Sequence, residues 1–190
     1  MTHYLDELIA TLKAVSIHRS GEPELGFEDG MTLLLSLFLT KKREGRTVCF
    51  IGNGGSAAIA THMTTDFFKN GGMKVASPFD LATMTCLGND YGYEHLFSKQ
   101  VERMMETGDL LVAISSSGKS PNIVNAIDAA HQNGADVLSF TGFSPDNKAR
   151  AMADYSVYIP SGEYGVVESC HNLMLQELVD KMKEREGLPS

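Results

Sequence analysis

The sequence predicts an α/β fold, a doubly wound parallel sheet flanked by helices, with a helical N-terminal extension. After residue 45, short apolar runs rich in β-branched residues alternate with segments of helical periodicity. This alternation is typical of a parallel sheet covered by helices on both faces. Two of the apolar runs end in glycine- and serine-rich turns that lead into helices. The 190 residues are 43% hydrophobic, which suffices for one compact domain with a sizeable core.

The first 45 residues contain two segments with helical spacing of apolar residues, 4–18 and 28–43, joined by a Gly- and Pro-containing linker. The second ends in a basic run and Gly45, which is typical of a helix C-terminus. Both helices carry more apolar side chains than a peripheral hairpin needs. We therefore expect residues 1–45 to serve in oligomerisation and residues 46–190 to form the main domain, the alternative being that the two helices only pack on the sheet.

After residue 45, strands and helices are expected to alternate along the chain, and the sequence shows no internal repeat. Strands are expected at 47–51, near 81–85, and at 109–115, 136–141 and 155–159. Helices are expected at 56–69, 90–106, 120–133, near 147–152 and at 165–186.

Composition restricts the class of partner. A formal net charge of −8 and a pI near 5.2 argue against a nucleic-acid or anionic-membrane surface. The three cysteines include no CxxC pair, which favours a reducing compartment. The N-terminus lacks the pattern of a signal peptide, and the longest apolar run, 33–39, is too short to span a bilayer. We expect a soluble cytoplasmic protein.

The first small-residue turn is Gly52-Asn53-Gly54-Gly55-Ser56. It offers positions for positive φ, an amide side chain and a hydroxyl at a helix start, where the helix dipole favours an anion. Its spacing matches neither the GxGxxG pattern nor a Walker loop. The glycines alone are compatible with a simple tight turn.

The second turn, Ser115-Ser116-Ser117-Gly118-Lys119-Ser120, places four hydroxyls before Pro121, which suits the first turn of a helix. A serine-rich capping turn is the alternative. Ser115, Ser117 and Ser120 are the first choices as phosphate or hydroxyl ligands. Two such turns in one domain predict a ligand with a phosphate at one end and several hydroxyls, that is, a sugar phosphate.

These motifs carry a family resemblance. Residues 52–56 followed by His62, then 88–94, 97–102, 108–111 and 114–122, resemble the SIS (sugar isomerase) domain family in order and spacing, and most closely the phosphoheptose isomerases. The resemblance extends over about residues 47–180. It implies a homotetramer with sites shared between subunits, which converts sedoheptulose 7-phosphate to D-glycero-D-manno-heptose 7-phosphate for surface polysaccharide. The substrate contacts that it implies are Asn53, Gly54, Gly55, Asn89, Asp90, Ser115, Ser116, Ser117 and Ser120. Ser56, the hydroxyl of the first turn, is also expected to bind substrate. Asn89 and Asp90 also suit a helix N-cap pair.

The sequence departs from the family where the chemistry is expected. Aldose–ketose isomerisation needs a base and an acid or metal that polarises the carbonyl group. The family pattern has a His with a Glu four residues later, and a Gln…His pair on the last helix. Here His62 is followed by Asp66, which is one methylene shorter than Glu. Aligned on His171, Glu168 stands in place of the Gln, and Gln176 in place of the His.

Three hypotheses follow from these departures. In the first, Glu168 is the catalytic base and His171 or Asp66 is its acid partner, although Glu168 and His171 also suit a simple ion pair on the helix surface. In the second, a zinc or other divalent ion is held by His62, Asp66, Glu168 and Gln176. In the third, catalysis is lost, and the fold serves as a non-catalytic sugar-phosphate-binding or partner-binding scaffold.

Overall fold

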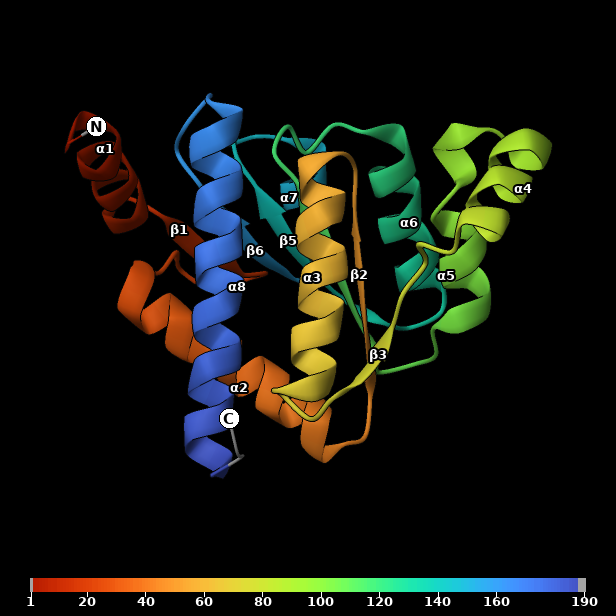
Figure 1. Cartoon of the computed structure of the whole chain (residues 1–190), viewed down its shortest axis with the longest axis horizontal. Helices are drawn as coiled ribbons and strands as arrows, with labels where there is room; N and C mark the ends of the chain where they lie inside the picture. Colours follow the sequence, from red (N-terminus) through yellow and green to blue (C-terminus); the bar gives the residue numbers. More distant parts are fainter. Residues whose placement is uncertain (1, 188–190) are drawn as a thin grey trace.

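The computed structural model describes residues 2–187 and has a six-stranded sheet between two layers of helices (Figure 1). The sheet order is β1-β6-β5-β4-β2-β3; β2 to β6 run parallel and β1 is antiparallel to β6. This confirms the predicted fold class. The strands are β1 Ser16–Arg19, β2 Thr47–Gly52, β3 Lys74–Ala76, β4 Leu110–Ser115, β5 Asp136–Thr141 and β6 Tyr155–Tyr158. The helices are α1 Thr2–Lys13, α2 Phe27–Arg43, α3 Gly55–Lys69, α4 Leu81–Tyr91, the 3-10 helix η1 Tyr93–His95, α5 Ser98–Met104, α6 Pro121–Gln132, α7 Lys148–Met152 and α8 Tyr164–Glu186.

The strand order reverses between β2 and β4. From β4 the chain continues to β5 and β6 on one side, whereas β2 continues to β3 on the other. Open α/β sheets bind ligands at such a switch point, beyond the carboxyl ends of the strands. Gly52 at the end of β2 pairs with Ile114 near the end of β4. The two small-residue turns therefore leave neighbouring strands at the same edge of the sheet.

The sheet separates two hydrophobic clusters. On one face, α2, α3 and α8 cover buried side chains such as Phe50 and Phe140, and Phe67 of α3 packs on Phe38 and Phe50. On the other face, α5, α6 and α7 cover the alternate residues of the same strands, including Ile51 and Val137. Burial on both faces explains why the central strands are continuous apolar runs.

The N-terminal segment joins the same core. Residues 16–18 were expected at the end of the first helix, but residues 16–19 form β1 and pair with β6 at the edge of the sheet. Ile17 of β1 and Leu34 and Phe38 of α2 are fully buried in the first cluster. The assignment of residues 1–45 to oligomerisation stays a prediction, but the core itself crosses residue 45.

One region was predicted wrongly. Residues 81–85, expected as a strand, begin the helix α4, whose N-cap Asp80 accepts a hydrogen bond from the Thr83 amide. The third strand is instead the short β3. The helix expected at 90–106 is divided by Gly92, whose φ of 86° ends α4, into η1 and α5.

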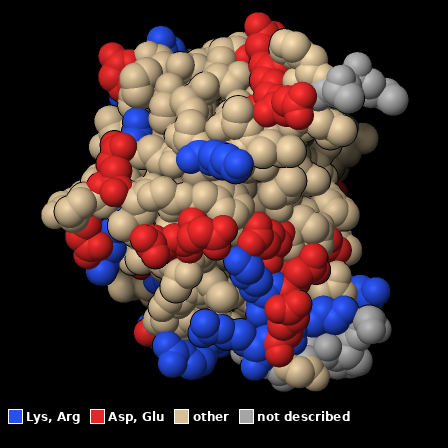
Figure 2. Space-filling view, turned by 90° about the vertical axis from the view of Figure 1, so that its left-hand side faces the viewer, with Lys and Arg blue, Asp and Glu red and all other residues tan. Residues whose placement is uncertain are grey.

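Charges of both signs lie on the face formed by the left side of Figure 1, with Lys and Arg gathered toward one end and Asp and Glu across the middle (Figure 2). The ends of α2 and α8 contribute basic side chains, among them Lys42, Lys183 and Arg185, which complement the negative ends of the helix dipoles. Among the helices within residues 2–187, none has the length and apolar character needed to cross a membrane.

Candidate functional site

The pocket at the switch point is built from both predicted turns and the start of α8. It has a volume of about 120 Å³. Six of the predicted substrate-binding residues line it, and they come from β2–α3 and β4–α6. The lining residues are Asn53, Ser56, Ile114, Ser115, Ser116, Ser117, Ser120, Tyr164 and Glu168.

The serine turn is held by its own backbone and by the loop after β5. Ser115 Oγ accepts from the Gly118 amide at 3.2 Å, and the Gly142 amide donates to the Ser116 carbonyl at 2.9 Å. Gly118 has a φ of 61° and lies so close to Asn147 that a Cβ would collide with the Asn147 side chain. These hydrogen bonds and the close contact with Asn147 fix the conformation of the turn, and its hydroxyls lie near the start of α6.

Two hydroxyls of this serine turn make no hydrogen bond among the described residues and are available to a ligand. Ser116 is 4% exposed, and its Oγ has no hydrogen-bond partner within the described part of the chain. A buried hydroxyl without a partner costs on the order of 1–3 kcal/mol. Ser120 is the N-cap of α6, but its side chain makes no capping hydrogen bond. Both hydroxyls lie where the α6 dipole favours an anion.

Glu168 faces the first turn of α3. A Cβ on Gly55 would lie 2.7 Å from the carboxyl carbon of Glu168. The helices α3 and α8 begin at the same end of the molecule and run side by side (Figure 1), which brings the two residues together. Gly55 is thus needed for space, and Gly54 has a φ of 55°, which favours glycine. Neither glycine lines the pocket, and their predicted contact with substrate stays a prediction.

His171 lies beneath the pocket and not in it. Its ring is fully buried, packs edge-to-face on Phe140, and places Nε2 3.2 Å from the Thr141 carbonyl oxygen. Because a carbonyl can only accept, Nε2 carries the hydrogen, and Nδ1 has no hydrogen-bond partner among the residues that the structure describes. Burial lowers the pKa of His171 to about 4, with the Thr141 hydrogen bond opposing the shift. The structure thus corrects both expectations for this residue, the acid partner and the surface ion pair.

His62 and Asp66 pair with each other further along α3, with His62 Nε2 3.3 Å from Asp66 Oδ2. Asp66 lies about 16 Å along the helix from Gly55, at roughly 1.5 Å per residue. It does not line the pocket, nor does the half-buried Gln176 on α8. No three His, Cys, Asp or Glu side chains in residues 2–187 converge into a metal-binding group. As placed here, His62, Asp66 and Glu168 do not come together around one metal ion.

Asn89 and Asp90 are exposed in the last turn of α4 and are not at the pocket. Asn89 donates to Asp90 Oδ1 at 2.9 Å, and Cys86 Sγ lies 3.6 Å from Asp90. The alternative of an N-cap pair is wrong, because Asp80 caps α4 and these two residues end it.

Residues outside the prediction also shape the site. Tyr164, one helical turn before Glu168, lines the pocket, and its ring stacks edge-to-face on Phe143 with centroids 4.7 Å apart. Phe143 itself has a φ of 60°, which is costly for a bulky residue and recurs at functional sites. The spacing of four from Glu168 was the sequence signal for Tyr164.

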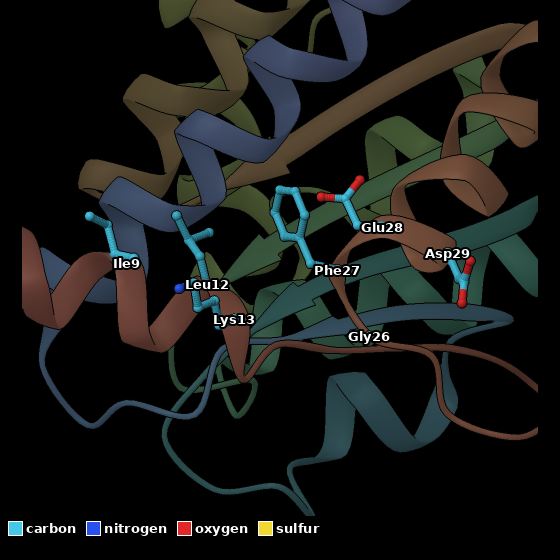
Figure 3. Close-up of a pocket in the computed structure, with 7 residues that line it drawn as sticks. All are labelled: Ile9, Leu12, Lys13, Gly26, Phe27, Glu28 and Asp29. Carbon is cyan, nitrogen blue, oxygen red and sulfur yellow. The ribbon is translucent and has the colours of Figure 1, made fainter.

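A second, larger cavity of about 510 Å³ lies between α1 and the start of α2, away from this chemistry. Ile9, Leu12 and Phe27 project to the same side of it (Figure 3). Its remaining lining residues are Lys13, Gly26, Glu28 and Asp29.

Together, the fold and the pocket define a doubly wound α/β protein with a serine-lined pocket at the switch point of its sheet. The SIS domain model matches residues 3–142. The phosphoheptose isomerase of Nitratidesulfovibrio vulgaris is 39% identical over 145 residues, 73% of this chain and 69% of that protein, and the one from Neisseria gonorrhoeae is 32% identical over 93% of both. The solved structure of the N. gonorrhoeae phosphoheptose isomerase superposes with a TM-score of 0.83, at 27% identity and 96% coverage of both chains. The chain belongs to the SIS domain family, in its phosphoheptose isomerase branch.

Proposed function

We propose that this protein is an aldose–ketose isomerase that converts sedoheptulose 7-phosphate to D-glycero-D-manno-heptose 7-phosphate. Its relatives named phosphoheptose isomerase cover most of the chain. The observation that carries the proposal is the position of the Glu168 carboxylate, which shares one small pocket with the serine turn.

The charges and hydroxyls around the pocket favour one orientation of the bound substrate. The first turn of α3 already faces the Glu168 carboxylate, so a phosphate placed there would meet a like charge. The start of α6 offers the hydroxyls of Ser116 and Ser120 instead. The phosphate therefore binds at α6, and the reacting carbons lie toward Glu168.

Glu168 then acts as the general base. Its carboxylate removes a proton from C1 of the ketose, the C1–C2 enediol forms, and Glu168, after exchanging this proton with solvent, delivers a proton to C2. The proton on O1 moves to O2, so the product is an aldose with no net change in protons. A positioned base of this kind contributes about 10²–10⁴-fold.

Glu168→Gln tests this role, with Glu163→Gln as the matched control on the exposed start of the same helix. We expect Glu168→Gln to lose turnover of sedoheptulose 7-phosphate by at least about 10²-fold while it still binds the sugar phosphate. Saturable binding without turnover in the wild-type protein would support the alternative of a non-catalytic binding or scaffold protein.

We also propose that the enzyme is a cytoplasmic homotetramer assembled through its N-terminal helices. Tyr4, Leu5 and Ile9 are exposed on α1, and Ile9 lines the apolar cavity of Figure 3. Burial of such a patch by another subunit is favourable, and completion of the site from a neighbour would account for the distance of Asn89 and Asp90 from the pocket. Ile9→Glu is expected to give a smaller species by light scattering, whereas Glu7→Gln is not.

A further inference from the structure

Three side chains from separate segments meet at Asn53. Asn53 Nδ2 donates to Asn122 Oδ1 at 2.9 Å, and Asn122 Nδ2 donates back to Asn53 Oδ1 at 2.8 Å. The Tyr93 hydroxyl donates to the same Asn53 Oδ1 at 2.9 Å. Asn122 is 1% exposed in the first turn of α6, and Tyr93 begins η1. The three bonds connect the two ligand-binding turns through their side chains.

These bonds determine what Asn53 offers to a ligand. A carboxamide oxygen has two lone pairs and its nitrogen has two hydrogens. Both lone pairs of Asn53 Oδ1 are used, by Asn122 and Tyr93, whereas one hydrogen of Nδ2 is used, by Asn122. Because Asn53 lines the pocket, the second N–H is the group available there.

We propose that Asn122 and Tyr93 are positioning residues that fix the Asn53 amide so that it presents one N–H donor, and no acceptor, to an oxygen of the substrate. This inference rests on the isomerase activity proposed above. In the enediol the oxygens on C1 and C2 gain negative charge, and Glu168, which acts on C1, lines the same pocket. A donor held in place before reaction stabilises such charge without reorganisation.

Asn122→Asp removes this constraint with little change in shape. Aspartate is favoured in the first turn of a helix, but its ionised carboxylate only accepts hydrogen bonds. The Asn53 amide must then turn its N–H groups toward residue 122. We expect kcat to fall by roughly 10²-fold, as for loss of one oxyanion donor. KM should rise as well, because the new carboxylate lies in the first turn of α6, where the phosphate is proposed to bind, so the comparison of kcat with KM is made on Tyr93→Phe. Tyr93→Phe is expected to lower kcat by roughly 3–10-fold, as for one neutral hydrogen bond.

The matched control is Gln132→Glu, the same amide-to-acid change at the exposed end of α6, which should retain wild-type kcat. A double-mutant cycle separates positioning from general damage. In an Asn53→Ala background, neither Asn122→Asp nor Tyr93→Phe should lower kcat further. Additive losses would overturn the proposal, as would a wild-type kcat in Asn122→Asp. If Asn122→Asp fails to fold, the Tyr93→Phe cycle gives the same decision.

A second readout needs no turnover. In ¹H–¹⁵N spectra the Asn53 side-chain amide, identified by its absence in Asn53→Ala, should have one slowly exchanging proton and one that shifts when sedoheptulose 7-phosphate is added. In Asn122→Asp this asymmetry should be lost. If the wild-type protein turns over no substrate, the isomerase proposal fails, and this spectrum alone decides whether the amide is fixed. Two equivalent, rapidly exchanging protons in the wild-type protein would refute the positioning role.

Discussion

The carboxylate of Glu168 lies against Gly55, so that residue 55 has no room for a side chain while Glu168 keeps its position. The two residues are far apart in sequence but lie near the starts of neighbouring helices, α3 and α8. This contact explains a glycine at the first position of a helix, where nearly any other residue is conformationally acceptable.

Gly55→Ala should therefore displace the proposed base. A methyl group there forces the Glu168 carboxylate to move by about an ångström or more, and a shift of that size costs on the order of 10²-fold in rate. We expect kcat to fall without loss of the folded state. Gly162→Ala is the control, because no atom of the described residues lies within 4 Å of its Cβ position. Wild-type kcat in Gly55→Ala would show that the Glu168 position is not critical.

Ser116 and Ser139 form a natural pair for testing the phosphate site. Both have buried hydroxyls without a partner among the described residues, but Ser116 lines the pocket and Ser139 lies within β5. Removal of an unpaired buried hydroxyl should leave stability unchanged or raise it, so both alanine variants should unfold at or above the wild-type midpoint. Only Ser116→Ala should weaken inorganic phosphate binding, by about tenfold or more. Equal phosphate affinity in the two variants, measured by calorimetry, would remove Ser116 from the site.

His171 should make stability fall in acid. Its pKa is lowered to about 4 in the folded state, against an ordinary value near 6.5, so the unfolded chain binds the proton first as the pH falls. The contribution of neutral His171 to the free energy of unfolding is complete above about pH 6.5 and is lost toward pH 4. At pH 5 the loss amounts to about 2 kcal/mol. His171→Gln should abolish this part of the loss between pH 7 and pH 5 in urea unfolding. An unchanged loss in the variant would mean that His171 does not titrate as its burial indicates.

Metal removal gives a further prediction. Since His62, Asp66 and Glu168 do not converge into a metal-binding group, prolonged treatment with a chelator should leave kcat/KM within about twofold of its initial value. Added Zn²⁺ should not raise it. Activity that disappears on chelation and returns with Zn²⁺ would show that these side chains come together in the working enzyme.

The parallel sheet and both ligand turns could be predicted from local sequence, because strands buried on both faces and turns rich in glycine and serine leave clear patterns. The strand β3 could not, since it has three residues, and α4 was mistaken for a strand because its sequence lacks a wide apolar face. No residue of α4 is buried, so packing left little periodicity to read.

Some residues of the site could likewise be predicted from local sequence, and others could not. Asn53 and the serines were found from their motifs, whereas the places of His171 and Asp66 depend on which side of a helix faces the pocket. Glu168 and His171 are three residues apart, yet one lines the pocket and the other is buried on Thr141. The bonds from Asn122 and Tyr93 to Asn53 join residues distant in sequence and needed the tertiary structure.

The most direct test of the account follows the proton that Glu168 is proposed to move. Sedoheptulose 7-phosphate is incubated with the protein in D₂O, and the aldose product is examined by NMR for deuterium at C2. We predict product labelled at C2 with the wild-type protein and with Glu163→Gln, and neither product nor exchange at C1 with Glu168→Gln. Labelled product formed by Glu168→Gln at the wild-type rate would contradict the assignment of Glu168 as the base.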